Sequence, residues 1–202
     1  LSSINNCIHQ QLNAYEPNLD LSDIDLQGNH HFFLWHTWFA DVLSPTQGAG
    51  GFDILIGNPP YIQLQNNGGE LAKRYERCGF QSFARTGDIY CLFYELGQHL
   101  LRPGGHLCYI TSNKWMRAGY GENLRRFFVE HTNPKLLIDF AGIQIFDNAT
   151  VDTNILLYAK EPNQFHTSCA VMKDKNGLIN LSDYVRQNAA PSNFRSADSW
   201  VI

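Results

Sequence analysis

The spacing of apolar positions changes at a few places along the chain, and these changes divide it into expected elements. Residues 52–57, FDILIG, form a continuous apolar run of strand length, which is typical of a strand covered on both faces of a sheet. Apolar residues recur at helical spacing over 89–100, where Asp88 is the expected N-cap and RPGG at 102–105 the stop signal. A second amphipathic helix is expected at 122–131. Its side chains expected to face inward are Leu124, Phe127 and Phe128.

Three further apolar segments have the length and composition of strands. They are HLCYITS, KLLIDFAG and NILLYAK, at residues 106–112, 135–142 and 154–160. Strands that alternate with helices predict an α/β fold, with a mostly parallel sheet and helices on both faces. In such sheets ligands bind at the carboxyl ends of the strands. We therefore expect functional residues directly after FDILIG.

The rest of the chain has a weaker pattern. Residues 1–51 form a polar and aromatic lead-in, within which residues 30–43 fit either a strand or a short buried segment. Residues 62–87 are expected to be a polar connection with one helix near ELAKRYERC. We expect one domain part at 52–160, a boundary near its end, and a polar C-terminal extension at 161–202.

Composition limits the function classes only moderately. The 202 residues are 44% hydrophobic and 17% charged, as in an ordinary globular domain with a substantial core. The net charge of −4 argues against a strongly basic nucleic-acid surface. No apolar run is long enough for a membrane span, no signal peptide is recognisable, and the five cysteines are scattered, which favours a cytoplasmic setting. Histidines cluster at 30, 31 and 36 without a spaced cysteine or acidic partner, so no metal is expected.

The tetrapeptide after the first strand, residues 58–61, carries the candidate chemistry. Each proline fixes its own φ, lacks an N–H and pushes the preceding residue into extended geometry. The loop is therefore stiff and rich in acceptors. The Asn58 amide oxygen and the Pro59 carbonyl can converge on one external group with two donors, such as an exocyclic amine, and Tyr61 offers a flat ring for stacking on a base. The alternative is a proline-rich turn with a buried tyrosine.

The motifs around this tetrapeptide resemble those of a known family. GGFDILIGNPPYIQ, residues 50–63, resembles motif IV of amino-methylating DNA methyltransferases, in the form typical of gamma-type adenine-N6 enzymes. Residues 87–116 resemble motifs V and VI, residues 122–128 motif VII, and residues 145–160 motif VIII. The ordered series resembles the methyltransferase domain of a type IIG restriction–modification enzyme.

The resemblance implies part of a Rossmann-like sheet, its C-terminal half, and an S-adenosylmethionine-dependent reaction on double-stranded DNA. A methyl group would be transferred to N6 of a flipped adenine. Asn58, Pro59, Pro60 and Tyr61 would then be the catalytic tetrapeptide. Tyr61 and Phe146 would stack on opposite faces of the base.

The resemblance also implies residues for the cofactor. Asn58 and Phe93 would contact S-adenosylmethionine, with the Phe93 ring against the cofactor's adenine. Independently of the resemblance, Lys114 and Arg117 follow the expected strand at 106–112 and are candidates to contact DNA phosphates; the alternative is that they are solvated loop charges.

Several parts of the family pattern do not appear in the sequence. The glycine-rich cofactor loop and the acidic residue of the following strand are not recognisable, nor is a target-recognition region. We therefore expect a fragment that is inactive alone and lacks the main S-adenosylmethionine-binding motifs. No nuclease site is visible, so Mg²⁺ is not implied. The alternatives are a glutamine-N5 or RNA amino-methyltransferase, or a non-catalytic DNA- or protein-binding fragment.

Overall fold

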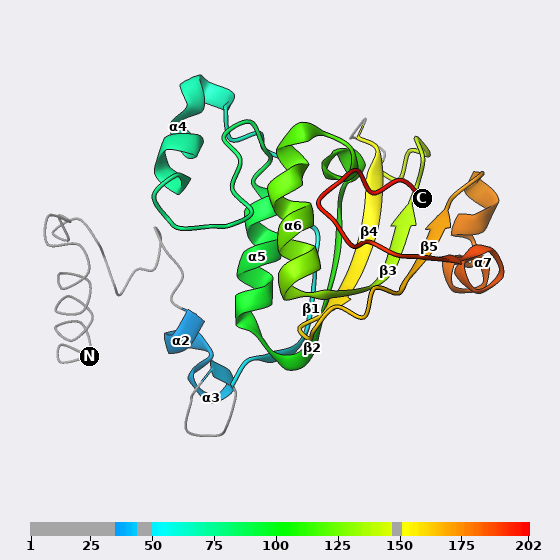
Figure 1. Ribbon diagram of the computed structural model, residues 1–202, viewed down its shortest axis with the longest axis horizontal. Helices are drawn as coiled ribbons and strands as arrows, with labels where there is room; N and C mark the ends of the chain where they lie inside the picture. Colours follow the sequence, from blue (N-terminus) through cyan, green and yellow to red (C-terminus); the bar gives the residue numbers. More distant parts are fainter. Residues whose placement is uncertain (1–34, 44–49, 147–150) are drawn as a thin grey trace, which may run out of the picture. The chain divides into compact units, whose positions relative to one another are not determined.

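The computed structural model describes residues 35–43, 50–146 and 151–202 (Figure 1). Residues 1–34 of the expected lead-in and the side chains of the clustered histidines lie outside what it describes. The chain divides into two compact units, Leu1–Asp41 and Val42–Ile202. Within the described ranges, no helix has the length and apolar character needed to cross a bilayer, and no three potential metal ligands gather.

The described part of segment 30–43 is helical, so neither alternative considered for it is correct. It forms two short helices, α2 (Trp35–Trp38) and α3 (Ala40–Leu43). The Trp35 and Phe39 rings are four residues apart and stack at 5.9 Å between centroids, and the Phe39 N–H donates to the Trp35 carbonyl. A helical turn brings positions i and i+4 together, which a strand does not.

In the described part of the chain, six strands form one sheet in the order β1-β2-β4-β3-β5-β6. The strands are β1 (Phe52–Gly57), β2 (Leu101–Ser112), β3 (Asn133–Asp139), β4 (Thr153–Ala159), β5 (Thr167–Val171) and β6 (Ala190–Ser192). β1 pairs in parallel with β2, and β3 with β5, while β4 is antiparallel to both β2 and β3. β6 is antiparallel to β5. Four of these six strands therefore run in one direction, but only two of the five pairings are parallel. The α/β class is confirmed, and the sheet is mixed.

Helices cover both faces of this sheet, as expected. The longer helices of the second unit are α4 (Asn66–Tyr75), α5 (Tyr90–Leu100), α6 (Glu122–His131) and α7 (Leu181–Asn188), and the 3-10 turns are η2 (Asn113–Met116), η3 (Gly119–Gly121) and η4 (Lys175–Leu178). α5 and α6 lie on one face (Figure 1). There the rings of Tyr94 and Phe128 meet edge to face, with centroids 5.1 Å apart. α7 packs on the other face through Tyr184 and its neighbours. The three residues of α6 expected to face inward are all buried.

Helix α5 is buried on two sides, which its aliphatic pattern did not reveal. Tyr90 and Tyr94 pack in the main core against the sheet. Ile89 and Leu92 pack in a second cluster with residues around α4. The N-cap position is Ile89 without a side-chain cap, so the expectation that Asp88 caps this helix is wrong. The Asp88 carboxylate instead accepts a hydrogen bond from a tyrosine of η3, described below.

The expectation that FDILIG is covered on both faces is also wrong for the described structure. β1 is an edge strand whose burial alternates, with Ile54 62% and Ile56 79% exposed. These two residues share a sheet face with their β2 partners His106 and Cys108. α7 covers this face further along, beside β3 and β5.

Residues 161–202, expected as a polar extension, contribute to the same compact unit as the preceding strands. β5 extends the sheet beside β3, and the last residues return to the main core. Trp200 is buried there, stacked on Phe194 at 4.1 Å and packed against Phe128 at 5.7 Å. The polar composition of this segment therefore conceals two strands and a core tryptophan.

Candidate active site at the carboxyl end of β1

The tetrapeptide begins directly after Gly57, the last residue of β1. A Cβ at Gly57 would lie 3.1 Å from the ring of Tyr109, so glycine allows the chain to leave the strand close to that ring. Asn58 and Pro60 are exposed, whereas Pro59 is buried. The buried proline thus anchors the loop and leaves the Asn58 amide accessible from outside.

Tyr61 holds the Asn58 side chain in place. Its hydroxyl donates to Asn58 Oδ1 at 2.8 Å and also lies 3.4 Å from the Ile110 carbonyl. Partial burial raises the pKa of Tyr61, so the hydroxyl stays protonated and continues to donate at neutral pH. An amide oxygen has two acceptor sites. The one that Tyr61 leaves open is available to an external donor.

Short backbone pairings attach the chain after Tyr61 to the start of α5. The Leu64 N–H donates to the Gly87 carbonyl at 2.8 Å, and the Ile89 N–H donates to Ile62 at 2.9 Å. Gln63 and Asp88 form an isolated β-bridge between these bonds. Residues from two distant parts of the sequence therefore lie at the same edge of the site.

A cavity of about 240 Å³ opens at this edge. Its lining residues are Tyr61, Gln63, Asn66, Asp88, Ser112, Lys114 and Val151. They surround an aromatic ring with one carboxylate, one ammonium group, two amides and a hydroxyl. Such a set can bind a small, flat, polar group by stacking and hydrogen bonds. The ends of β1 and β2 and the residues before β4 all contribute to it.

A hydrogen-bonded chain of tyrosines connects two residues of this cavity wall. The Tyr120 hydroxyl donates to the Asp88 carboxylate at 3.0 Å, and the Tyr90 and Tyr120 hydroxyls lie 2.8 Å apart. The Tyr90 ring in turn meets the Tyr61 ring edge on, with centroids 6.3 Å apart at 88°. Burial raises the pKa of Tyr90 and of Tyr120, so both hydroxyls stay protonated.

Of the residues that the sequence predicted, Tyr61 and Lys114 line the cavity, and Asn58 adjoins it through the Tyr61 hydroxyl. Lys114 follows Ser112, whose hydroxyl accepts from the Lys114 N–H. Phe146 is half-buried and is not among the lining residues; its carbonyl accepts from the Gln144 side chain. The stacking role of Phe146 stays a prediction.

Phe93 and Arg117, predicted for the cofactor and for DNA, lie outside the cavity wall. Phe93 is half-buried on α5, where it packs with Leu92 in the second cluster. The Arg117 guanidinium lies 3.6 Å from the buried carboxylate of Asp139, which offsets its charge. Their roles toward cofactor and DNA stay predictions.

Sequence reasoning missed five lining residues, namely Gln63, Asn66, Asp88, Ser112 and Val151. Gln63 and Asn66 were part of a polar connection, and Asp88 had been interpreted as a helix cap. The one available signal was position, because Ser112 ends an expected strand whose carboxyl end lies beside that of β1.

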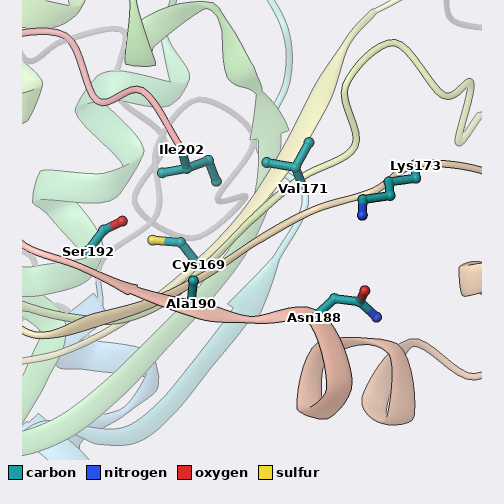
Figure 2. A pocket seen from close by; sticks show the side chains of 7 residues that line it. All are labelled: Cys169, Val171, Lys173, Asn188, Ala190, Ser192 and Ile202. Atoms are coloured by element: carbon teal, nitrogen blue, oxygen red, sulfur yellow. The ribbon is translucent and has the colours of Figure 1, made fainter.

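A second hollow, of about 200 Å³, lies between β5, β6, the end of α7 and the last residue (Figure 2). Figure 2 shows the Cys169 thiol and the Lys173 side chain on its wall. Burial raises the pKa of Cys169 to about 11, so this thiol is protonated and a poor nucleophile at neutral pH. The first cavity is therefore the better candidate for an active site.

Comparison with known proteins decides the family. A model of the Eco57I restriction-modification methylase family matches residues 1–146. The chain belongs to this family. Its expected resemblance to type IIG and type II DNA methyltransferases is thereby confirmed.

Curated proteins similar to this chain cover different shares of it. The type II restriction enzyme and methyltransferase RM.Eco57I of Escherichia coli is 29% identical over 75% of the chain and 15% of its own length. The type II methyltransferase M.PaeR7I of Pseudomonas aeruginosa is 31% identical over 54% of the chain and 19% of its own length. M.HincII of Haemophilus influenzae is 23% identical over 91% of the chain and 36% of its own length. The chain thus spans well under half the length of these relatives.

Solved structures show the same fold as this family member. The type IIG restriction endonuclease BpuSI superposes on 75% of the chain with a TM-score of 0.53 and 16% identity, over 20% of its own length. A type I restriction-modification methyltransferase subunit from Streptococcus thermophilus covers 76% of the chain with a TM-score of 0.53 and 19% identity, over 37% of its own length. These likenesses confirm the Rossmann-like methyltransferase fold.

Proposed function

We propose that the protein acts in a restriction–modification system and transfers a methyl group from S-adenosylmethionine to N6 of an adenine flipped out of double-stranded DNA. Residues 52–160 carry the catalytic part. The observation that carries the proposal is the Asn58–Tyr61 tetrapeptide at the carboxyl end of β1, with the Asn58 amide oxygen held by Tyr61 beside a polar cavity. Membership of the Eco57I methylase family supports it.

The tetrapeptide explains how a weak nucleophile is activated. The lone pair of an adenine amino group is delocalised into the ring. When Asn58 Oδ1 and the Pro59 carbonyl accept its two hydrogens, the nitrogen becomes pyramidal and its lone pair localises. The second acceptor site of the Asn58 oxygen remains available for this bond. The tetrapeptide thus orients the amine for attack on the methyl group, with the neutral thioether of S-adenosylhomocysteine as the leaving group. No acid–base pair is needed, because the methylated nitrogen is acidic and loses its extra proton to solvent.

The described residues fit only the edge of a cofactor site. Phe93 is half-buried on α5, so part of its ring remains accessible for stacking, and the Asn58 side chain is exposed. S-adenosylmethionine, when bound, supplies an electrophilic methyl group on a sulfonium. We propose that Phe93 contacts its adenine and that Asn58 lies beside it.

The energetics of base flipping favour two aromatic walls. Removing a base from the duplex costs a few kcal/mol. Stacking on one aromatic ring returns about 1–3 kcal/mol, so Tyr61 alone barely offsets the cost. We propose Phe146 as the second wall. Lys114, exposed on the cavity wall, and Arg117 would contact the phosphates of the distorted strand.

The decisive experiment replaces Asn58 in the enzyme expressed from its complete coding sequence. Asn58→Ala should lower methyl incorporation into unmethylated phage DNA by roughly 100-fold or more, because the amine loses an acceptor that acts only during transfer. DNA affinity, measured by fluorescence anisotropy, should change by less than about threefold. Asn176→Ala, at an exposed asparagine of η4, is the matched control.

Mass spectrometry of the DNA product separates the alternatives. The proposal requires N6-methyladenine from the wild-type enzyme. Formation of N4-methylcytosine, or methylation of RNA or a release factor instead of DNA, would refute it. Near-normal turnover of Asn58→Ala would refute the role of the tetrapeptide.

A further inference from the structure

We infer that Tyr90, Tyr120 and Asp88 form a hydrogen-bonded chain that fixes the Tyr61 ring relative to the rest of the cavity wall. Tyr120 is then a positioning residue for capture of the substrate base. This inference rests on the proposed function, because it assigns these three hydrogen-bonded residues a role in holding a flipped base against Tyr61.

The direction of the hydrogen bonds follows from proton counting. A tyrosine hydroxyl has one proton. Tyr120 donates its proton to Asp88 Oδ2 at 3.0 Å, so at the 2.8 Å contact between the hydroxyls Tyr90 is the donor and Tyr120 the acceptor. The chain therefore runs in one direction, from Tyr90 through Tyr120 to the Asp88 carboxylate. Each hydroxyl polarises the next, which strengthens both bonds.

Both ends of this hydrogen-bonded series, Asp88 and Tyr90, reach the same cavity. Asp88 lines it directly, and Tyr90 touches the lining residue Tyr61 through an edge-on ring contact. The backbone also connects the loop that carries Tyr61 to Asp88, because Gln63, two residues after Tyr61, forms a β-bridge with Asp88. The position of the Tyr61 ring is thus restrained both by the loop backbone and by its contact with the Tyr90 ring.

Tyr120 belongs to a separate element, η3, and the fold makes room for it. A Cβ on Gly87 would lie 3.0 Å from the Ala84 carbonyl oxygen, which favours glycine there, and 3.4 Å from Tyr120 Cδ2, an ordinary contact distance. Within the described residues, Tyr120 is the side-chain donor to Asp88, which is only 7% exposed. If this donor is removed, the carboxylate must take hydrogen bonds from water or from the cavity.

A core hydroxyl elsewhere in the protein should behave differently. Tyr184 on α7 donates to the Val171 carbonyl at 2.9 Å on the other face of the sheet. The Tyr184 hydroxyl also accepts from the Lys173 N–H at 3.2 Å, so Tyr184→Phe removes one donated and one accepted hydrogen bond, as Tyr120→Phe does, but does not touch the cavity. It therefore serves as the matched control for a purely structural effect.

The test measures kinetics and base capture in the enzyme expressed from its complete coding sequence. Tyr120→Phe should lower kcat/KM for DNA by roughly tenfold, the order expected when a charge-assisted hydrogen bond is lost. The emission of 2-aminopurine at the methylated position should fall with it. The melting temperatures of Tyr120→Phe and Tyr184→Phe should agree within a few degrees, and Tyr184→Phe should keep wild-type kinetics.

A double mutant and a conservative variant test whether the three hydrogen-bonded residues act together. Because the two hydroxyls act as a unit, Tyr90→Phe with Tyr120→Phe should cost no more than about twice the worse single change. Asp88→Asn keeps an acceptor for Tyr120 and should retain more activity than Asp88→Ala.

The outcomes separate this inference from the proposed function. If the wild-type enzyme methylates adenine but Tyr120→Phe matches Tyr184→Phe in kinetics and emission, the inference is wrong and the function stands. Single effects of Tyr90→Phe and Tyr120→Phe that multiply in the double mutant would also overturn the inference. If the wild-type enzyme produces no N6-methyladenine, the proposed function fails first.

Discussion

The hydroxyl of Tyr61 and its ring are proposed to do different work, and one substitution separates them. Tyr61→Phe removes the proton donor that lies 2.8 Å from Asn58 Oδ1 and the weaker 3.4 Å contact with the Ile110 carbonyl. It keeps the aromatic ring, which makes a T-shaped contact with the Tyr90 ring. The stacking surface for a base therefore remains, while the Asn58 amide loses the group that orients it.

The expected magnitude follows from the two interactions. A neutral hydrogen bond at a partly exposed site contributes about 0.5–1.5 kcal/mol, so kcat should fall by about 2- to 10-fold. Loss of the ring in Tyr61→Ala removes about 1–3 kcal/mol of stacking, which corresponds to about 5- to 150-fold weaker capture of the base. Tyr61→Phe should leave KM for DNA within about twofold of the wild type.

Steady-state kinetics and 2-aminopurine emission measure these effects separately. Tyr61→Phe should keep the emission and lose kcat, whereas Tyr61→Ala should lose both. A rise in kcat with Tyr61→Phe would show that the hydroxyl competes with the substrate for the Asn58 acceptor, and would contradict the orienting role. Equal loss of emission in the two variants would contradict the separation of ring and hydroxyl.

Two further predictions concern packing and charge. Phe128→Ala should lower the free energy of unfolding by about 3–5 kcal/mol, because its fully buried ring packs against the Tyr94 and Trp115 rings at 5.1 and 5.2 Å between centroids. The loss is measured as a shift in the urea midpoint at constant m. A loss below about 1 kcal/mol would show that the core is not packed this way. Lys114→Ala should reduce the slope of log DNA affinity against log salt concentration by about 1. Arg117→Ala should reduce this slope by less, because the Asp139 carboxylate at 3.6 Å already offsets the Arg117 charge. An unchanged slope for Lys114→Ala would show that Lys114 does not contact DNA.

The sequence predicts best those features that depend on local spacing. Helix α6 spans Glu122–His131, as its apolar period indicates, because the inward positions of a helix repeat every three to four residues whatever lies opposite. The tetrapeptide lies at the carboxyl end of β1 because strand, glycine and prolines follow one another in the chain. Tyr61 and Lys114 could be proposed for the site on the same basis.

Features that depend on distant neighbours were predicted less well. The run Ile54-Leu55-Ile56 is apolar throughout, but its composition alone does not tell which face of the strand other elements cover. Ile56 remains 79% exposed. Asp88 has the sequence context of a helix cap, and only the fold brings the Tyr120 hydroxyl close to it. Trp200 lies in a polar segment, where one aromatic residue gives no periodic signal. Most residues of the cavity wall were missed for the same reason, since they come from segments that are far apart in the sequence.

The reversed direction of β4 has a consequence for how such an enzyme can diversify. Because β4 runs against β2 and β3, its first residues, rather than its last, arrive at the edge where β1 and β2 finish. The connection from β3 therefore ends there, with Val151 on the cavity wall and the Asp152 carbonyl accepting from the Asn113 N–H. Changes of length or composition in that connection can reshape the pocket while the strand framework is left intact. The pocket and the strand framework can thus vary independently at this hairpin.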